Sequence, residues 1–152
     1  MKEKLVIIFL FILIAANAFA FERNKFGLGV VAGDPTGITA KYMINNDFGI
    51  DATVGWKTSG DDEFYISADY VLHIYNLIKI PEGISPLYFG DGLRYIDREE
   101  EENKFGIRIP FGVEYLFLNN SLGAFGEIVP ILDLTPDIES DLEFGVGIRY
   151  FF

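Results

Sequence analysis

The chain has 152 residues, enough for one domain, and a formal net charge of −11 from 23 acidic and 12 basic residues. A chain this acidic lacks the electrostatic footprint needed to bind nucleic acid. It contains no cysteine, which excludes a disulfide framework, a thiolate metal site and a lipidated N-terminal cysteine.

Residues 1–20 have the features of a secretory signal peptide. Lys2 and Lys4 give a basic start, residues 5–16 are an unbroken apolar run, and residues 18–20 read Ala-Phe-Ala, which fits the small-residue pattern of a cleavage site. The alternative is an uncleaved membrane anchor. A spanning helix needs about 20 apolar residues, so this run is too short, and we expect cleavage.

Cleavage leaves residues 21–152 as a single mature domain. Two lysines and one glutamate leave with the signal, so the mature chain has 10 basic and 22 acidic residues and a formal charge of −12. Its sequence contains no low-complexity segment and no composition shift that would mark a second domain.

Apolar residues alternate with small or polar residues through most of the mature chain. In residues 105–117, for example, one row begins with Phe105, Ile107 and Ile109, and the opposite row contains Arg108. A period of two is that of a β-strand with two unlike faces. Turn-rich pieces between the strands are short enough for an up-and-down antiparallel meander. The eight expected strands are residues 26–32, 37–44, 48–56, 64–75, 87–96, 105–117, 122–132 and 142–152.

The two rows of each strand differ in composition. One row is bulky and rich in aromatic residues, and the other combines glycine with a sparse set of charges. A water-facing row that is half glycine makes a poor strand surface, whereas small residues beside a few large charged ones suit the inside of a narrow barrel. The expected interior charges are Lys41, Asp51, Asp69, Arg94, Arg108, Glu114, Glu127 and Arg149.

This composition favours a membrane barrel over a soluble, ligand-carrying barrel of the lipocalin kind, in which the apolar row would point inward. A β-sandwich core is a further alternative. In hydrocarbon each unpaired backbone group costs several kcal/mol, so a sheet there must close on itself. We therefore expect an all-β fold, an eight-stranded antiparallel up-and-down transmembrane β-barrel.

The pattern resembles that of small eight-stranded outer-membrane barrels such as the OmpA transmembrane domain and OmpX. The most specific element of the resemblance is the end of the chain, where an apolar row ends in phenylalanine. That row consists of Phe144, Val146, Ile148, Tyr150 and Phe152. The resemblance implies that the outer-membrane assembly machinery reads this row.

It also implies a protein that is exported through the periplasm to the outer membrane of a diderm bacterium. Both termini of the mature chain would then lie in the periplasm. Its partners would be outer-membrane lipid and lipopolysaccharide, and it would be a monomer. Asp91 departs from the pattern because it falls on the row expected to face lipid. Either the register shifts there, or the charge lies near an interface, where its cost is lower.

The expected interior charges allow two interpretations. They can pair as a salt-bridged plug that braces the barrel, or they can line a narrow conduit. An eight-stranded barrel is only wide enough for its side chains to fill it, and an unpaired charge in that space is costly. We therefore expect a plug.

A catalytic role would have to include His73, the single histidine of the chain. Ser67 and Asp69 share its strand face, but at about 3.3 Å per residue they lie roughly 20 and 13 Å away. A nucleophile must lie within about 3 Å of its base, so we expect no catalytic residues, although a partner from another strand is conceivable.

Three acidic stretches, at residues 61–63, 99–102 and 137–141, fall in loops on the expected outer side. Their spacing matches no defined calcium loop, and solvated loop charge is the simpler interpretation. Neither a metal nor a cofactor is expected. We predict a membrane-structural or interaction role without catalysis; the alternatives are a small passive channel and a lipid-modifying enzyme that uses His73.

Overall fold

The computed structural model describes residues 25–57 and 63–152. The expected signal peptide, residues 1–20, lies outside this part of the chain. Within the described part the regular structure is β-strand, and no helix there is long and apolar enough to cross a membrane.

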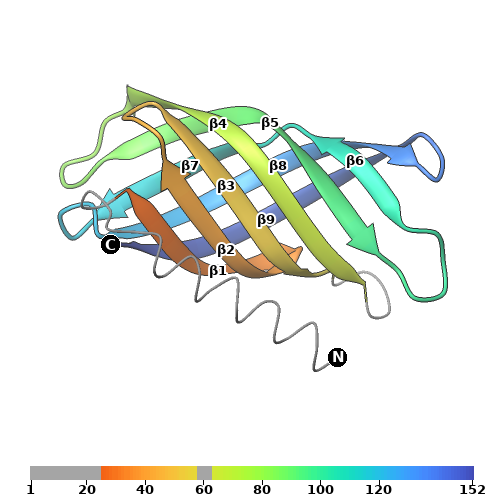
Figure 1. Ribbon diagram of the computed structural model, residues 1–152. Coiled ribbons are helices and arrows are strands. Elements are labelled where there is room, and N and C mark those ends of the chain that lie inside the picture. Colours follow the sequence, from red (N-terminus) through yellow and green to blue (C-terminus); the bar gives the residue numbers. More distant parts are fainter. Residues whose placement is uncertain (1–24, 58–62) are drawn as a thin grey trace.

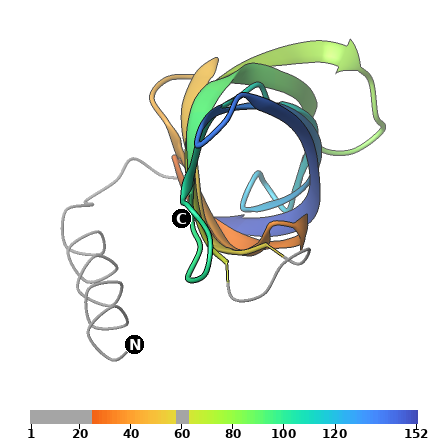
Figure 2. The same ribbon diagram turned by 90° about the vertical axis from the view of Figure 1, so that its right-hand side faces the viewer.

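The described residues form nine strands, and every pairing between them is antiparallel. The sheet order is β4-β3-β2-β1-β9-β8-β6-β5-β7, and β4 also pairs with β5, so the sheet returns on itself. Figures 1 and 2 show the result, a barrel-like ring of strands. Side chains, which a ribbon does not include, lie inside this ring. The strands are β1 (Phe26–Asp34), β2 (Thr36–Met43), β3 (Phe48–Trp56), β4 (Phe64–Ile78), β5 (Ser85–Asp97), β6 (Lys104–Arg108), β7 (Phe111–Phe117), β8 (Leu122–Thr135) and β9 (Glu139–Phe151).

The single strand expected over residues 105–117 is divided into β6 and β7, so that detail of the prediction was wrong. Pro110 has no backbone N–H and cannot donate to the ladder. Its carbonyl still accepts from the Gly90 N–H at 3.1 Å, and the Ile109 N–H donates to the Pro130 carbonyl at 3.0 Å. The two strands therefore share one place, between β5 and β8, and the ring has eight positions as expected.

Closure of the ring depends on β1 and β9. These strands pair from Gly27 opposite Phe151 to Asp34 opposite Phe144, so the last strand pairs with the first. The backbones approach closely at Gly29, where an added Cβ would lie 1.8 Å from the Ile148 carbonyl oxygen. We call the end of the ring where β1 begins and β9 ends the terminal end, and the opposite end the loop end.

Three strands run three residues further than the sequence pattern predicted. β4 continues to Ile78 instead of residue 75, β8 continues to Thr135 instead of residue 132, and β9 begins at Glu139 instead of residue 142. In the hairpin of β8 and β9, Asp133 lies opposite Glu139. In the sequence, polar residues at these positions are typical of a turn. In the structure they belong to the hydrogen-bonded ladder of β8 and β9.

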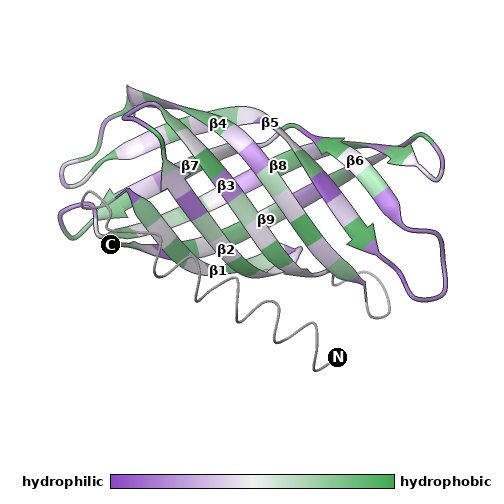
Figure 3. Cartoon of the chain, viewed as in Figure 1, coloured by the Kyte–Doolittle hydropathy of each residue, from purple (hydrophilic) through white to green (hydrophobic). Residues whose placement is uncertain are grey.

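Hydrophilic and hydrophobic residues alternate along the strands (Figure 3), and the two faces of the sheet differ accordingly. Large apolar side chains point outward on every side of the ring; Val30, Trp56 and Val146 are each more than half exposed. Asp91 also points outward, opposite Tyr70, in a stretch of the β4–β5 ladder whose register does not shift. The inward face carries most of the charged strand residues.

A pair of glycine substitutions tests this geometry. At Gly147, which faces inward, an added Cβ would lie 2.4 Å from the Val30 carbonyl oxygen and 2.5 Å from the Phe125 ring. At Gly126, which faces outward, the nearest atom would be 3.9 Å away. Gly147→Val should lower the free energy of unfolding, measured by urea titration of the refolded protein, by about 1–3 kcal/mol or more. Gly126→Val should leave it nearly unchanged, and equal losses would contradict the assigned faces.

Candidate functional site

The candidate site is the charged interior of the ring. Alternation along the strands turns one residue in two inward, so charges that are far apart in the sequence meet there. All eight residues expected inside point inward and take part in at least one ion pair. They are Lys41, Asp51, Asp69, Arg94, Arg108, Glu114, Glu127 and Arg149.

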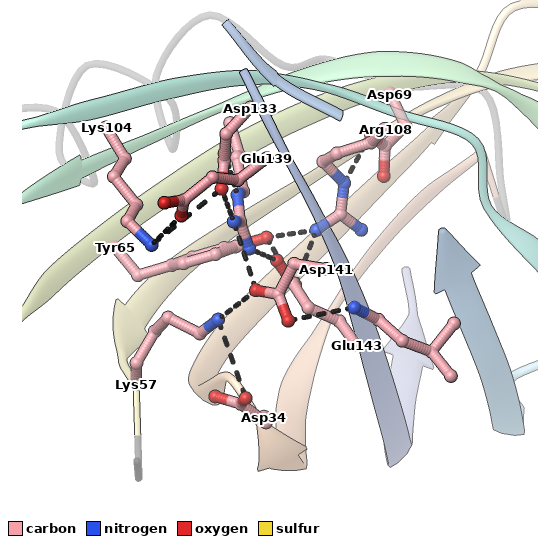
Figure 4. A network of polar contacts seen from close by, with 12 residues as sticks. Asp34, Lys57, Tyr65, Asp69, Lys104, Arg108, Asp133, Glu139, Asp141 and Glu143 are labelled. Carbon is pink, nitrogen blue, oxygen red and sulfur yellow. Dashed lines mark hydrogen bonds and ion pairs between the residues drawn. The ribbon is translucent and has the colours of Figure 1, made fainter. Parts of the chain in front are cut away.

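The cluster nearer the loop end is built around two arginines that share Glu143 (Figure 4). Arg94 binds Asp133 with two nitrogens, at 2.6 and 3.1 Å, and also pairs with Glu143. Arg108 donates from Nε to Asp69 at 2.8 Å and from Nη1 to Glu143 at 3.1 Å. Glu143 therefore neutralises charge from two guanidinium groups at once.

Tyr65 completes this cluster. Its hydroxyl donates to Oε2 of Glu143 at 2.8 Å and contacts the Arg108 guanidinium. The side chain is fully buried, as is usual only for a tyrosine whose hydroxyl has a partner.

The cluster nearer the terminal end contains Lys41 and Arg149, which share two carboxylates. Arg149 lies 3.2 Å from Glu114 and 3.5 Å from Asp51, and Lys41 lies 3.4 Å from Glu114 and 3.6 Å from Asp51. Arg149 also donates to the Thr39 hydroxyl at 2.9 Å. Two cations and two anions thus form a compact square of opposite charges.

One aromatic residue, Tyr88, connects the two clusters. The Tyr88 hydroxyl donates to Glu127 at 2.8 Å, and Glu127 lies 3.7 Å from Arg108. The centroid of the Tyr88 ring also lies 4.4 Å from Nζ of Lys41. A cation this close to an aromatic face is attracted to it, so the polar contacts continue from one cluster to the other.

The interior is filled along this network. A hollow beside Arg108, Glu127 and Glu143 has a volume of about 10 Å³, which is at the lower limit for one water molecule. The three interior arginines are each at most 2 % exposed. Buried side chains of the described residues thus pack the middle of the ring.

His73 lies in the terminal-end cluster, and its two ring nitrogens already have partners. Nε2 is 2.9 Å from the Lys41 ammonium, and Nδ1 is 3.1 Å from the Asp47 carbonyl oxygen. An ammonium can only donate, so Nε2 is the acceptor and Nδ1 carries the proton. Asp69, which shares its strand face, is bound to Arg108 instead. The histidine is therefore held by a lysine and a backbone carbonyl.

The loop end carries a rim of further ion pairs. Lys57 lies 3.0 Å from Asp141 and 3.5 Å from Asp34, and Lys104 lies 3.7 Å from Glu139. These three acidic residues are thus already paired, and Glu139 and Asp141, which were expected in a loop, lie in β9. Among the residues that the structure describes, which exclude 61 and 62 of the first acidic stretch, no group of three or more His, Asp or Glu side chains is placed to hold a metal ion.

The last apolar row points away from the interior. Its members, from Phe144 to Phe152, are each between 43 % and 65 % exposed. Phe152 donates its backbone N–H to the Phe26 carbonyl at 2.9 Å, and the two rings stack with centroids 6.2 Å apart. The row therefore lies on the outer surface at the seam between β1 and β9.

Sequence reasoning missed two central members of the site, Asp133 and Glu143, each 1 % exposed. Glu143 lies within the eighth expected strand, directly before the terminal apolar row, and Asp133 directly follows the seventh expected strand. Applying the alternation to residue 143, and continuing it one residue past 132, would have included both. Which cations they bind depends on the register across the ring, and a single strand carries no signal for that.

A family model described as a protein of unknown function (DUF3996) matches residues 20–152. No curated protein and no solved structure matches the chain.

Glu143 and Glu139 provide a matched test of the interior network. Both are glutamates on the inward row of β9, but Glu143 is buried between two arginines whereas the Glu139 side chain is 59 % exposed. Removing one partner of a buried ion pair costs about 3–5 kcal/mol, and an exposed pair contributes about 1 kcal/mol or less. In urea titrations Glu143→Gln should therefore destabilise the fold strongly and Glu139→Gln weakly. Similar effects of the two changes would show that the interior is solvated.

Proposed function

The chain belongs to the DUF3996 family, and we propose that it is an eight-stranded transmembrane β-barrel of an outer membrane. Its role in this proposal is membrane-structural or interactional, without catalysis. The proposal rests on one observation: the charged side chains point into the ring and the large apolar side chains point outward, the reverse of a soluble barrel.

The outer face is difficult to reconcile with water. Soluble monomers rarely expose contiguous apolar patches larger than a few hundred Å², and here the apolar row faces outward on neighbouring strands all around the ring. Outward side chains of four strands, Val30, Ile38, Ile66 and Val146, are each at least 42 % exposed. Lipid is the surrounding that such a face fits.

The backbone supports the same setting. A sheet in hydrocarbon needs every edge paired, and the ring satisfies this through the ladders of β1 with β9 and of β4 with β5. About 9–11 tilted residues span a bilayer. Four of the strands, β4, β5, β8 and β9, have 13 to 15 residues, so they are longer than the hydrocarbon layer requires and their ends extend beyond it.

The location follows from the resemblance and the expected signal. In the proposal the signal peptide at residues 1–20 directs export through the periplasm, and the assembly machinery reads the outward row that ends in Phe152. The mature protein then contacts outer-membrane lipid and lipopolysaccharide as a monomer. The loop end, with its paired acidic rim, faces the cell exterior.

The two alternatives lack a supporting observation. A passive channel needs a solvated path, but the paired arginines and the small hollow beside Arg108 favour a closed plug. Conductance steps with purified protein in a planar bilayer would favour a channel instead. An enzyme centred on His73 needs a nucleophile at a ring nitrogen, and both nitrogens face Lys41 and Asp47.

A charge placed on the outer face distinguishes lipid from water. Val146 is 65 % exposed on β9, and Ile138 is 76 % exposed in the turn at the loop end. An arginine on the lipid face of a barrel costs about 2–4 kcal/mol at mid-membrane and much less near the interfaces. Val146→Arg should therefore reduce insertion into lipid vesicles, measured by flotation, whereas Ile138→Arg should not. If both variants remained dispersed without detergent and neither lost stability, the membrane proposal would be wrong.

A further inference from the structure

The hairpin between β4 and β5 differs from the other turns of the ring. The register of the two strands shifts between Ile74 and Ile78, and Asn76 adopts a left-handed backbone conformation with φ of 69°. Such a bulge bends a strand. In the end view of Figure 2 the tip of β4 and the turn after it lie outside the circumference of the ring.

The exposed side chains of this hairpin include three large apolar ones, besides those of Asn76, Lys79 and Glu82. Leu77 is 63 % exposed, and Ile78 and Ile84 are each 38 % exposed. Its charges are one lysine and one glutamate, Lys79 and Glu82. By contrast, the turn between β2 and β3 at the same end of the ring has a polar tip, Asn-Asn-Asp at residues 45–47, and one exposed apolar residue, Ile44.

The returning limb of the hairpin is fixed to the end of β7. Ile84 and Leu116 exchange two backbone hydrogen bonds of 3.0 and 2.7 Å, and the Tyr115 hydroxyl donates to the Glu82 carbonyl at 3.2 Å. Gly83 has φ of 84°, and an added Cβ would lie 2.3 Å from the Leu116 carbonyl oxygen. The hairpin is therefore held against the wall of the ring.

Its position beside the wall indicates what it meets. Tyr115 and Phe117, stacked with centroids 5.2 Å apart, join the hairpin to the outward apolar face of β7. If the ring spans a membrane, a hairpin that bends sideways from its terminal end lies along the lipid surface and not in the periplasmic solvent. Apolar side chains with a tyrosine and a lysine nearby are typical of segments at the boundary between headgroups and acyl chains.

We propose that residues 76–84 are an interfacial anchor that inserts Leu77, Ile78 and Ile84 into the periplasm-facing leaflet, at the boundary between phospholipid headgroups and acyl chains. This inference rests on the proposed function, because it needs a ring that spans the membrane. It adds a lateral lipid contact on one side of the ring, which would fix the rotation and depth of the barrel.

Tryptophan quenching by lipid tests the anchor. The chain has one tryptophan, Trp56, which is 60 % exposed at the end of β3. Three proteins are refolded into vesicles of phosphatidylethanolamine and phosphatidylglycerol, with or without bromine on the upper acyl chain. They are the wild type, Trp56→Phe with Leu77→Trp, and Trp56→Phe with Asn46→Trp as the control in the polar turn. Folding of each is checked by gel migration before and after boiling.

The anchor predicts that bromine lowers the emission of the tryptophan at position 77 roughly twofold, because interfacial segments insert about 5–10 Å into the boundary. The tryptophan at position 46 should be unaffected. If Trp56 is quenched but the tryptophans at positions 77 and 46 are quenched equally weakly, the anchor is wrong, and solvent or a protein partner covers the hairpin. The membrane barrel would stand in that case. Absence of quenching in all three proteins would overturn the proposed function as well.

Discussion

Backbone hydrogen bonding between β1 and β9 joins the first strand of the sheet to the last and separates an inside from an outside. Without this ladder the sheet would have two open edges and two accessible faces. With it, the period-two alternation separates interior residues from exterior residues, because every second residue of each strand faces a closed interior. Glycine at Gly29 and Gly147 lets the backbones and the Phe125 ring approach closely at this seam.

The closed interior in turn determines how its charges must be arranged. Removing an ion from water costs several kcal/mol even after relaxation, so each interior charge needs partners of opposite sign. The ring provides them by sharing: Glu143 contacts Arg94 and Arg108, and Glu114 contacts Lys41 and Arg149. A shared network of this kind specifies one packing of the interior, since moving one member leaves another buried and unpaired.

The alternation in the sequence predicted which residues face inward, because a strand has a period of two wherever it lies in the fold. It therefore placed Arg94, Arg108 and Arg149 on one face without any knowledge of their partners. Strand ends were less predictable. Asp133 and Glu139 resemble turn residues in isolation, but the ladder of β8 and β9 continues to them, and Lys104 lies beside both.

The interruption at Pro110 shows a different limit. Proline disrupts the ladder locally, but its neighbours keep the register on both sides, so the ring gains no additional position. The contacts of His73 with Lys41 and with the Asp47 carbonyl were also beyond sequence reasoning. They join β4 to β2 and to the turn before β3, and they depend on the register of the β2–β3 and β3–β4 ladders.

The central claim is that the outward apolar face contacts lipid, and site-directed spin labelling measures this directly. The chain has no native cysteine, so single cysteines at Val30, Ile38, Ile66 and Val146 can each carry a nitroxide on a different strand without removal of other thiols. In refolded vesicles the account predicts that all four nitroxides are more accessible to oxygen, which concentrates in lipid, than to a water-soluble nickel chelate. A nitroxide at Ile138 should show the reverse. Greater accessibility to the nickel chelate at all four strand positions would contradict the account.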